Sequence, residues 1–307
     1  MDVFHNAKVK LCASMLIFGS MGLLVRGIAL PASVIALCRG VIGVLFLLCL
    51  CAAAKTRVSL PAIRKNIILL ICSGAALGAN WIFLFQAYRH TTIAVATLCY
   101  YFAPVLIMAA SPAVLNERLT GIKLGCMMAS ILGMALVSGI IGSSAGASVT
   151  GMIFGLAAAA SYAGFTLMNK FTKEISALDA TIAQLGVAAV VLSPYVLLTG
   201  GFAQLQWQAQ SLWRLLILGI VHTGLGFFLF FSSIQRLKAQ TAAMLSYIDP
   251  ITAILLSTLF LYEKMGSVQL IGACLILSAA FLSERLKGKI TQKLPPAAVS
   301  PQTISLP

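Results

Sequence analysis

Long apolar runs follow one another along this chain, and most of them are bounded by basic residues. A helix needs about 20 apolar residues to cross roughly 30 Å of hydrocarbon, and a helix pairs its own backbone groups in lipid. Composition agrees, because 60% of the residues are hydrophobic and only 9% are charged, against roughly 25% charged in soluble domains. The sequence therefore predicts an all-α integral membrane protein with about ten transmembrane helices. The expected spans are residues 10–27, 32–54, 66–87, 91–113, 121–141, 151–169, 178–199, 213–234, 239–261 and 266–283.

The 21 Lys and Arg residues give a net charge of +14, and they are spread unevenly over the predicted loops. Sixteen of them fall on one side of the membrane together with both termini, four fall on the other side, and Arg39 lies inside a span. Basic residues concentrate in cytoplasmic loops. We therefore expect a multi-pass protein of the cell (cytoplasmic or inner) membrane with both termini in the cytoplasm. The charge then reports topology and some affinity for anionic headgroups of the lipid bilayer, and no basic patch with interleaved aromatic residues indicates nucleic acid.

An internal repeat relates the two halves of the chain. A shift of 146 positions places Gln86–Glu117 on Ser232–Glu263. It aligns identical residues, namely Ala96 with Ala242, Tyr101 with Tyr247, Pro104 with Pro250, Ser111 with Ser257, Leu115 with Leu261 and Glu117 with Glu263. The expected organisation is a cytoplasmic N-terminus at 1–9, a five-helix repeat at 10–141, a linker at 142–150, a second five-helix repeat at 151–284 and a disordered cytoplasmic tail at 285–307.

An odd number of spans per half makes the second half enter the membrane from the opposite side. Glu117 is then expected at the cytoplasmic face and Glu263 at the outer face. Such 5+5 inverted repeats are typical of secondary transporters, in which two half-structures enclose a midplane site and rock against each other. The alternative is a duplication that only built a stable bundle, as it can in a channel or scaffold.

Several of these motifs resemble those of EamA-type proteins, a ten-helix branch of the drug/metabolite transporter (DMT) superfamily. In the first half the likeness lies in Gln86–Thr97, Ala103-Pro104 and Glu117-Arg118-Leu119-Thr120, and in the second half it lies in Gly219–Gly224, Ala239–Ala243, Asp249-Pro250 and Tyr262-Glu263-Lys264. Phe18, Asn116 and Tyr262 depart from the family pattern. The resemblance implies an inverted 5+5 fold, a monomer or weak homodimer, and transport of a small-molecule metabolite, with an amino acid exporter as the leading expectation.

Four polar residues inside spans are candidates for a substrate or coupling site, because an unpaired ionisable group is expensive in a membrane. Arg39, Asn80, His222 and Asp249 all fall roughly 10–14 Å below the predicted outer face. Asp249 is interpreted either as a proton carrier or partner of a substrate ammonium, or as a structural acid that is paired with Arg39 or hydrogen-bonded to backbone freed by Pro250. Arg39 either snorkels or pairs structurally, or it binds a substrate carboxylate. His222 is either a packed, hydrogen-bonded histidine or a proton relay.

Two prolines predict kinks at equivalent places in the two halves, because each removes a hydrogen bond one turn earlier. Pro104 and Pro250 are candidate gating hinges, although the shape of the bundle explains kinks as well. Tyr101 and Tyr247 precede these prolines by three residues and are candidates for lining a cavity, with aromatic packing as the alternative. Glu117 and Glu263 are expected to be structural caps or interfacial pairs. Pairs of glycines four residues apart predict close helix packing within the chain, and they are Gly74 with Gly78, Gly121 with Gly125 and Gly151 with Gly155.

The sequence favours a transporter over other membrane proteins. An enzyme is not expected, because the three histidines are scattered and no phosphate loop or nucleophile elbow is present. The eight cysteines form no CxxC pair, so no metal site and no cofactor is expected, although coupling to protons is possible. Loops too short to offer a partner surface argue against a scaffold. The prediction is a secondary transporter that exports an amino acid or drug-like solute by alternating access, with an integral-membrane enzyme or a non-transporting scaffold as the alternative.

Overall fold

The computed structural model describes residues 6–25, 27–91, 93–117, 119–137, 148–200 and 208–260, together with scattered positions between 267 and 282. The described residues form helices, and six of these helices are long and apolar enough to cross a membrane. They are Ala7–Val25, Ala32–Ala53, Ile67–His90, Val149–Met168, Ala177–Leu198 and Ala209–Ile234. Shorter apolar helices accompany them. The all-α membrane fold is therefore confirmed, while the count of ten spans stays a prediction.

The helices follow one another with short connections. In chain order they are α1 (Ala7–Gly19), α2 (Met21–Val25), α3 (Ala32–Ala53), α4 (Leu60–Lys65), α5 (Ile67–His90), α6 (Ile93–Tyr100), α7 (Ala103–Leu115), α8 (Gly121–Val137), α9 (Val149–Met168), α10 (Ala177–Leu198), α11 (Ala209–Ile217), the π-helix η2 (Leu218–Leu225), α12 (Gly226–Ile234), α13 (Ala239–Ser246) and α14 (Ile248–Phe260). The predicted span 266–283 is described only at scattered positions between 267 and 282, and these positions are helical.

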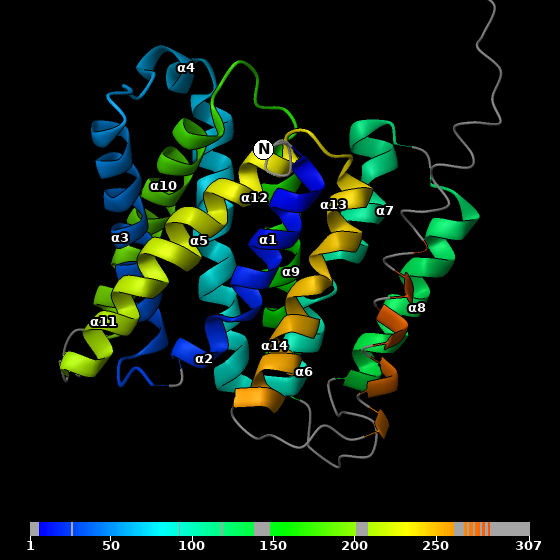
Figure 1. Cartoon of the computed structure of the whole chain (residues 1–307). Coiled ribbons are helices and arrows are strands. Elements are labelled where there is room, and N and C mark those ends of the chain that lie inside the picture. The colour runs from blue at the N-terminus through cyan, green and yellow to red at the C-terminus, as the bar shows by residue number, and fades with distance from the viewer. Residues whose placement is uncertain are drawn as a thin grey trace, which may run out of the picture.

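The bundle has two distinct ends. One end carries the start of α1, the helix α4 and the connection from α12 to α13 (Figure 1). We call it the basic end, because the residues flanking these helix ends include Lys8, Lys10, Lys55, Arg57, Arg64, Lys65, Lys123, Lys170, Lys173, Arg236 and Lys238. The opposite end carries α2 and the start of α11, and α14 ends there, whereas α7 ends at the basic end (Figure 1).

Large apolar side chains cover the outside of the bundle. Ile68, Val190, Leu198 and Val149 are among those most exposed, at 70–88% of their surface. A water-soluble protein would leave so many exposed apolar residues uncovered at a high cost in free energy. Their exposure follows if the surrounding medium is hydrocarbon.

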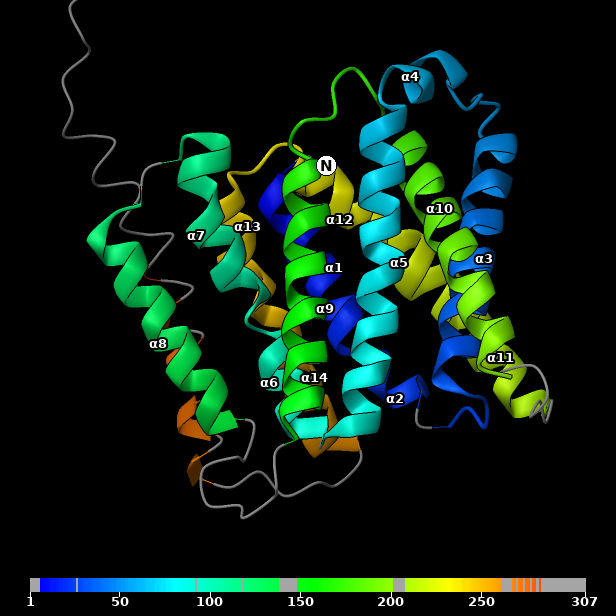
Figure 2. The same ribbon diagram turned by 180° about the vertical axis from the view of Figure 1, so that it is seen from behind.

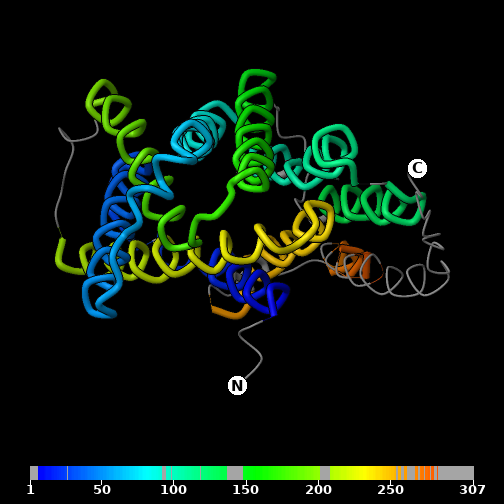
Figure 3. Tube along the Cα trace, turned by 90° about the horizontal axis from the view of Figure 1, so that it is seen from above, coloured from blue at the N-terminus to red at the C-terminus, as the bar shows by residue number. Residues whose placement is uncertain are grey.

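Helices from the two halves of the chain pack against each other. Helix α5 lies along α9, and α10 contacts both α5 and α3. Helix α3 contacts η2, α1 contacts α12 and α14, and α7 contacts α9 and α13. Viewed along the helices, the α5–α9 pair and the α1–α12 pair lie on opposite sides of the bundle (Figure 3), and from behind α9 stands between α7 and α5 (Figure 2). The halves therefore interlock as a single bundle.

Glycines set the closest of these contacts. A Cβ atom on Gly74 would lie 2.7 Å from the Val187 side chain on α10, and one on Gly155 would lie 2.7 Å from Cys99 on α6. The predicted packing roles of the first and third glycine pairs are thus confirmed. Nothing lies within 4 Å of a Cβ placed on Gly121 or Gly125, so the prediction for that pair is wrong among the described residues. The spacing alone carries no information about which face of a helix meets a neighbour.

The π-helix η2 arises where α3 comes closest to the second half. A Cβ on Gly219 would lie 2.4 Å from Ile42, and one on Gly224 would lie 2.7 Å from Phe46. The Thr223 hydroxyl donates to the Leu218 carbonyl at 3.0 Å, five residues back. This wider turn changes the direction of the following side chains, and π-helical turns occur frequently at functional sites.

The helices that carry the candidate hinges Pro104 and Pro250 are interrupted three residues or fewer before these prolines. Helix α6 ends at Tyr100 and α7 begins at Ala103, and α13 ends at Ser246 before α14 begins at Ile248. The predicted interruptions are therefore present in both halves. Their use as hinges stays a prediction.

Polar contacts close the basic end. The Glu117 carboxylate accepts hydrogen bonds from the backbone N–H groups of Ala239 at 2.8 Å and Gln240 at 3.2 Å, so it caps α13 as predicted for a structural acid. The Lys170 amine donates to the Ile234 and Leu237 carbonyls at the end of α12. Burial lowers the pKa of Lys170 to about 8, and the nearby Glu117 carboxylate opposes this shift. An acid and a base thus hold the connection between α12 and α13 from two sides.

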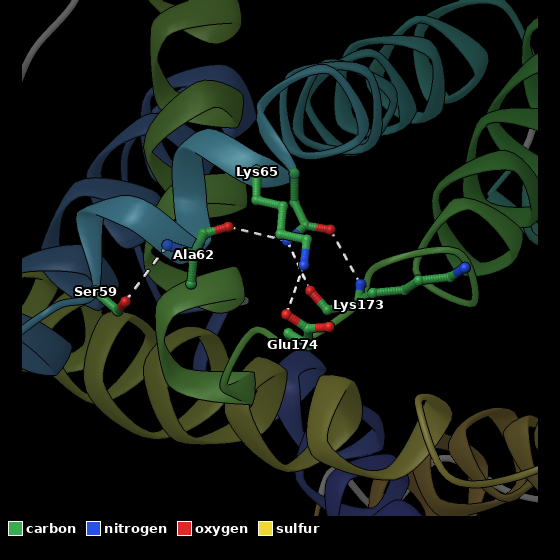
Figure 4. Close-up of polar contacts among 6 residues, drawn as sticks. Ser59, Ala62, Lys65, Lys173 and Glu174 are labelled. Carbon is green, nitrogen blue, oxygen red and sulfur yellow. Dashed lines mark hydrogen bonds and ion pairs between the residues drawn. The ribbon is translucent and has the colours of Figure 1, made fainter.

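A second contact at the basic end joins the two halves beside α4. The Asn66 side chain donates to the Ala62 and Lys173 carbonyls, both at 2.9 Å, and accepts from the Lys173 N–H at 3.0 Å. Ala62 and Lys173 lie close to Lys65 and Glu174 in this region (Figure 4). The neighbouring Lys65–Glu174 ion pair, at 2.5 Å, is exposed, and the hydrogen bond from Lys65 lowers the pKa of that carboxyl group. Exposed pairs stabilise little, so the buried Asn66 amide is the stronger link between the halves.

The α3–η2 contact yields a test of the packing. Replacing Gly219 by Ala places a methyl group against Ile42 and should destabilise the bundle by about 1–3 kcal/mol, seen as a lower midpoint of thermal unfolding in detergent. Gly186→Ala is the matched control, because nothing lies within 4 Å of a Cβ there and alanine favours a helix. Equal midpoints for the two variants would contradict the close contact.

Candidate functional site

A cavity of about 490 Å³ lies between the two halves. Its walls come from α1, α2, α3, α5, α6 and α7 in the first half and from α9, η2, α12, α13 and α14 in the second. Its polar lining residues are Arg39, Asn80, Tyr88, Thr97, Tyr100, Tyr101, Tyr162, His222, Ser246 and Asp249, and most of the other lining residues are apolar. A mostly apolar hollow with a few convergent polar groups has the character of a small-molecule site.

The cavity reaches the end of the bundle opposite the basic end. Val25, the last residue of α2, and Ala32, the first residue of α3, both line it. Tyr88, two residues before α5 ends, also lines it and is 36% exposed. Towards the basic end the interior is filled by fully buried side chains, among them Leu11, Leu47, Phe231 and Ile234. The cavity is therefore accessible from one end and sealed towards the other.

Asp249 lies half-buried in this cavity within a group of tyrosines. The Tyr101 hydroxyl interacts with the Asp249 carboxyl group, and the charge of Asp249 also acts on Tyr88, Tyr100 and Tyr162. Among the cavity-lining residues that the structure describes, Asp249 is the one carboxylate. Its first-turn position in α14, directly after the interruption at Tyr247, directs the side chain into the cavity.

Arg39 lines the same cavity from α3 and is 8% exposed. Its guanidinium carbon lies 4.3 Å from the centroid of the Trp81 ring, and an Nη1–H group donates to the Met21 sulfur at 2.7 Å. No ion pair with Asp249 is present among the described residues, so the structural alternative of an Arg39–Asp249 pair is wrong. Neither does Arg39 snorkel to the exterior, because its guanidinium remains buried beside Trp81.

His222 and Asn80 are held by hydrogen bonds on different helices, η2 and α5. The His222 Nε2 atom lies 3.0 Å from the Ser20 hydroxyl, at the interruption between α1 and α2. The Asn80 amide donates to the Ala158 carbonyl at 2.7 Å, joining α5 to α9, and it also interacts with Tyr100. Asn80 is only 1% exposed, which fits a positioning role better than direct contact with a solute.

The paired tyrosines and prolines of the repeat lie in different environments. Tyr101 and Pro104 line the cavity, whereas Tyr247 and Pro250 do not. Tyr247 is 1% exposed and packs in a core with residues such as Met108 and Ile251. Tyr247 therefore follows the aromatic-packing alternative and does not line the cavity, because the interruption directs this ring into the contact between α13 and α7. Sequence identity across the repeat does not ensure an equivalent environment.

Several lining residues were missed by the sequence analysis. Trp81, Tyr88, Tyr100 and Tyr162 have no charge to mark them within a span and resemble ordinary core aromatics. Two signals were available in the sequence. Trp81 and Tyr100 are the sequence neighbours of the candidates Asn80 and Tyr101. Tyr162 corresponds to Phe18 at a shift of 144 residues, and Tyr162 and Phe18 both line the cavity.

The two repeat tyrosines are expected to respond differently to removal of their hydroxyl groups. The Tyr247 hydroxyl is buried without a hydrogen-bond partner in the described part of the chain, so Tyr247→Phe should leave stability unchanged or raise it by roughly 1 kcal/mol. Tyr101→Phe should leave stability similar but change ligand binding and transport, because it removes the hydroxyl beside Asp249. Thermal unfolding and a transport assay on both variants check this. Loss of transport in Tyr247→Phe with Tyr101→Phe unaffected would contradict the assignment.

Comparisons with known proteins agree with this architecture. The chain matches the EamA-like transporter family over residues 8–139 and again over residues 149–285. It is 32% identical over 275 residues to the uncharacterized transporter YxxF of Bacillus subtilis, covering 86% of this chain and 87% of that protein. It is 24% identical to the protein RarD of Escherichia coli over 220 residues, covering 71% of this chain and 70% of RarD.

A solved crystal structure shares the fold. It superposes with a TM-score of 0.79 at 19% sequence identity and covers 91% of this chain and 98% of its own. The family match extends over nearly the whole chain, in agreement with the motifs, the apolar helices and the cavity between the halves. The chain is a membrane protein that belongs to the EamA-like transporter family of the drug/metabolite transporter superfamily.

Proposed function

We propose that this protein is a secondary transporter that exports a small organic solute, an amino acid or a drug-like compound, by alternating access. It acts in the cell membrane as a monomer or weak homodimer. About ten spans form two five-helix halves of inverted topology around the cavity. The observation that carries the proposal is a solute-sized cavity lined by both halves and accessible from one end only.

The contacts between helices support an inverted repeat. If α1, α3, α5 and the α6–α7 pair correspond to α9, α10, the α11–α12 segment and the α13–α14 pair, three of the main contacts between helices have counterparts. The α5–α9 contact corresponds to α12–α1, the α10–α5 contact to α3–η2, and the α7–α9 contact to α14–α1. The two family matches, at 8–139 and 149–285, divide the chain at the same place.

The charge distribution supports an orientation. The basic end carries most of the described Lys and Arg residues, and basic residues favour the cytoplasmic side. The cavity is accessible from the other end, so the described state is outward-facing. Helices α7 and α14 end at opposite ends of the bundle (Figure 1), as expected of equivalent helices in inverted halves.

A change to the inward-facing state requires the contacts that seal the basic end to separate while the opposite end closes. The polar contacts of Glu117 and Lys170 hold the α12–α13 connection at that end. The helix interruptions at Tyr101–Phe102 and Tyr247 lie in α6–α7 and α13–α14, the helix pairs that meet across the halves. A transition to an inward-facing state would bend these segments and release the α13 cap.

Asp249 is the group through which we propose coupling to protons. It is a carboxylate inside a mostly apolar cavity without an ion-pair partner among the described residues. A carboxylate in such surroundings carries its charge at a high cost unless it takes up a proton or a cationic group of the solute. Exchange of a proton at this position would link the gradient to solute movement.

The inverted topology can be tested by labelling. Asn116→Cys and Tyr262→Cys, each introduced next to its acid in a chain lacking the eight native cysteines, should react with a membrane-impermeant thiol reagent from opposite sides. Asn116→Cys should react from the cytoplasmic side and Tyr262→Cys from outside. Labelling of both from the same side would refute the inverted model.

The coupling role predicts the effect of Asp249→Asn. A screen of metabolite uptake and efflux with the purified protein in liposomes first identifies a transported solute. With that solute, Asp249→Asn should abolish transport driven by a proton gradient, because the asparagine amide takes up no proton near neutral pH. The exposed Glu174→Gln should retain activity. Full gradient-dependent transport by Asp249→Asn would rule out coupling through this residue.

A further inference from the structure

Arg39 carries a buried positive charge that the described part of the protein leaves without an anionic partner. It is 8% exposed and makes no ion pair among the described residues. Its position in the first third of α3 places it within the depth of the membrane. A guanidinium there stays charged, because its intrinsic pKa is far above neutral pH, and an uncompensated charge in such a place is expensive.

The neighbouring side chains satisfy the guanidinium only in part. The Trp81 ring covers it at 4.3 Å, and the Met21 sulfur accepts one N–H group. A thioether is a weak acceptor, and a cation–π contact compensates a charge less than a carboxylate does. The Nε–H group is buried without any partner in the described residues. Hydrogen-bonding capacity therefore remains unused on a group that lines the cavity.

A second polar group with unused capacity comes from η2. His222 is 5% exposed and lines the same cavity, and its Nε2 atom contacts Ser20. The ring also interacts with the Ile217 backbone, but its Nδ1 atom makes no regular hydrogen bond among the described residues. The Arg39 carbonyl oxygen lies 3.4 Å from the position of a Cβ on Gly219, one turn before His222. The close packing of α3 against η2 therefore brings the two polar side chains onto neighbouring parts of the cavity wall.

The arrangement selects one kind of anion. A guanidinium presents its N–H groups as a planar fork that matches the two oxygens of a carboxylate. Asp249 lines the same cavity, and whenever it is ionised it repels a dianion such as a phosphate monoester more strongly than a single carboxylate. Apolar residues, including Leu77, Phe85, Phe227 and Phe230, form much of the remaining wall.

We infer that Arg39, with His222 beside it and Trp81 behind it, forms a subsite for the carboxylate of the transported solute, whose apolar part lies against the aromatic wall. The inference rests on the proposed function, because it assigns a substrate class to the same cavity. It does not depend on the coupling ion or on the direction of transport.

Binding of three probes of similar size tests the subsite: 3-phenylpropionate, its neutral isostere 3-phenylpropionamide and the cationic 3-phenylpropylamine. Trp207→Phe and Trp213→Phe leave Trp81 as the single tryptophan of the three, so its fluorescence in detergent reports binding beside Arg39. We expect the carboxylate to bind at least about tenfold more tightly than the amide or the amine, as a bidentate charge-assisted contact would give. Equal affinities, tightest binding of the amine, or no saturable binding of the carboxylate would overturn the inference.

Variants in the same background identify the residue responsible. Arg39→Gln should weaken carboxylate binding roughly tenfold or more and leave amide binding nearly unchanged. Arg39→Lys keeps the positive charge and loses the two parallel N–H donors, so its carboxylate affinity should lie between those of Arg39→Gln and the protein with Arg39. This variant also tests the inference if Arg39→Gln does not fold. Arg64→Gln, an exposed arginine at the basic end, is the matched control. Unchanged carboxylate affinity in both Arg39 variants would overturn the inference.

These measurements use no gradient and need no transport. Failure of the proposed transporter would therefore appear as labelling of both cysteines from the same side, or as no transported solute in the liposome screen, while carboxylate binding persisted. Failure of the subsite would appear as a loss of the preference for the carboxylate probe while labelling from opposite sides persisted.

Discussion

Backbone groups in a membrane must find hydrogen-bond partners inside the protein, and this constraint explains where the helices of this chain are interrupted. Irregular backbone is tolerated in hydrocarbon only where protein or a polar cavity covers it. The described interruptions lie at Ser20, at Tyr101–Phe102, along η2 and at Tyr247, and each has a cavity-lining residue within or directly beside it. The departures from regular helix and the candidate site are thus parts of a single feature.

The same constraint explains how the cavity gets its polar groups. A regular apolar helix presents to its neighbours side chains chosen for packing. An interruption turns a side chain away from that packing, as η2 does for His222 and as the start of α14 does for Asp249. Each such group then needs a partner, and hydroxyls such as those of Ser20 and Tyr101 supply one. Arg39 comes from an uninterrupted helix and is left with the aromatic face of Trp81.

The two ends of the bundle differ in what holds them. Apolar packing and the contacts of Glu117, Lys170 and Asn66 close the basic end. These contacts are few and polar compared with the packed glycine surfaces that join α3 to η2 and α5 to α10. In an alternating-access cycle, polar caps at a helix end can exchange for water, whereas closely packed backbones cannot separate without opening voids. This difference favours movement of the helix ends, while the α3–η2 and α5–α10 contacts stay rigid.

The sequence by itself determined the class of structure and the approximate location of the site. Apolar runs of membrane length, the uneven basic loops, the repeated Pro-to-Glu spacing and the family motifs all depend on local composition, which lipid constrains strongly. Arg39, Asn80, His222 and Asp249 could be predicted because a polar group inside a span is conspicuous, and Tyr101 because it precedes the repeated proline by three residues. Tertiary structure alone decided that Tyr247 packs in the core, that Arg39 meets Trp81 instead of Asp249, and that Tyr88, Tyr100 and Tyr162 surround the acid. Periodicity gives the depth of a residue in the membrane, but its direction depends on helix rotation and on interruptions that only the packed bundle fixes.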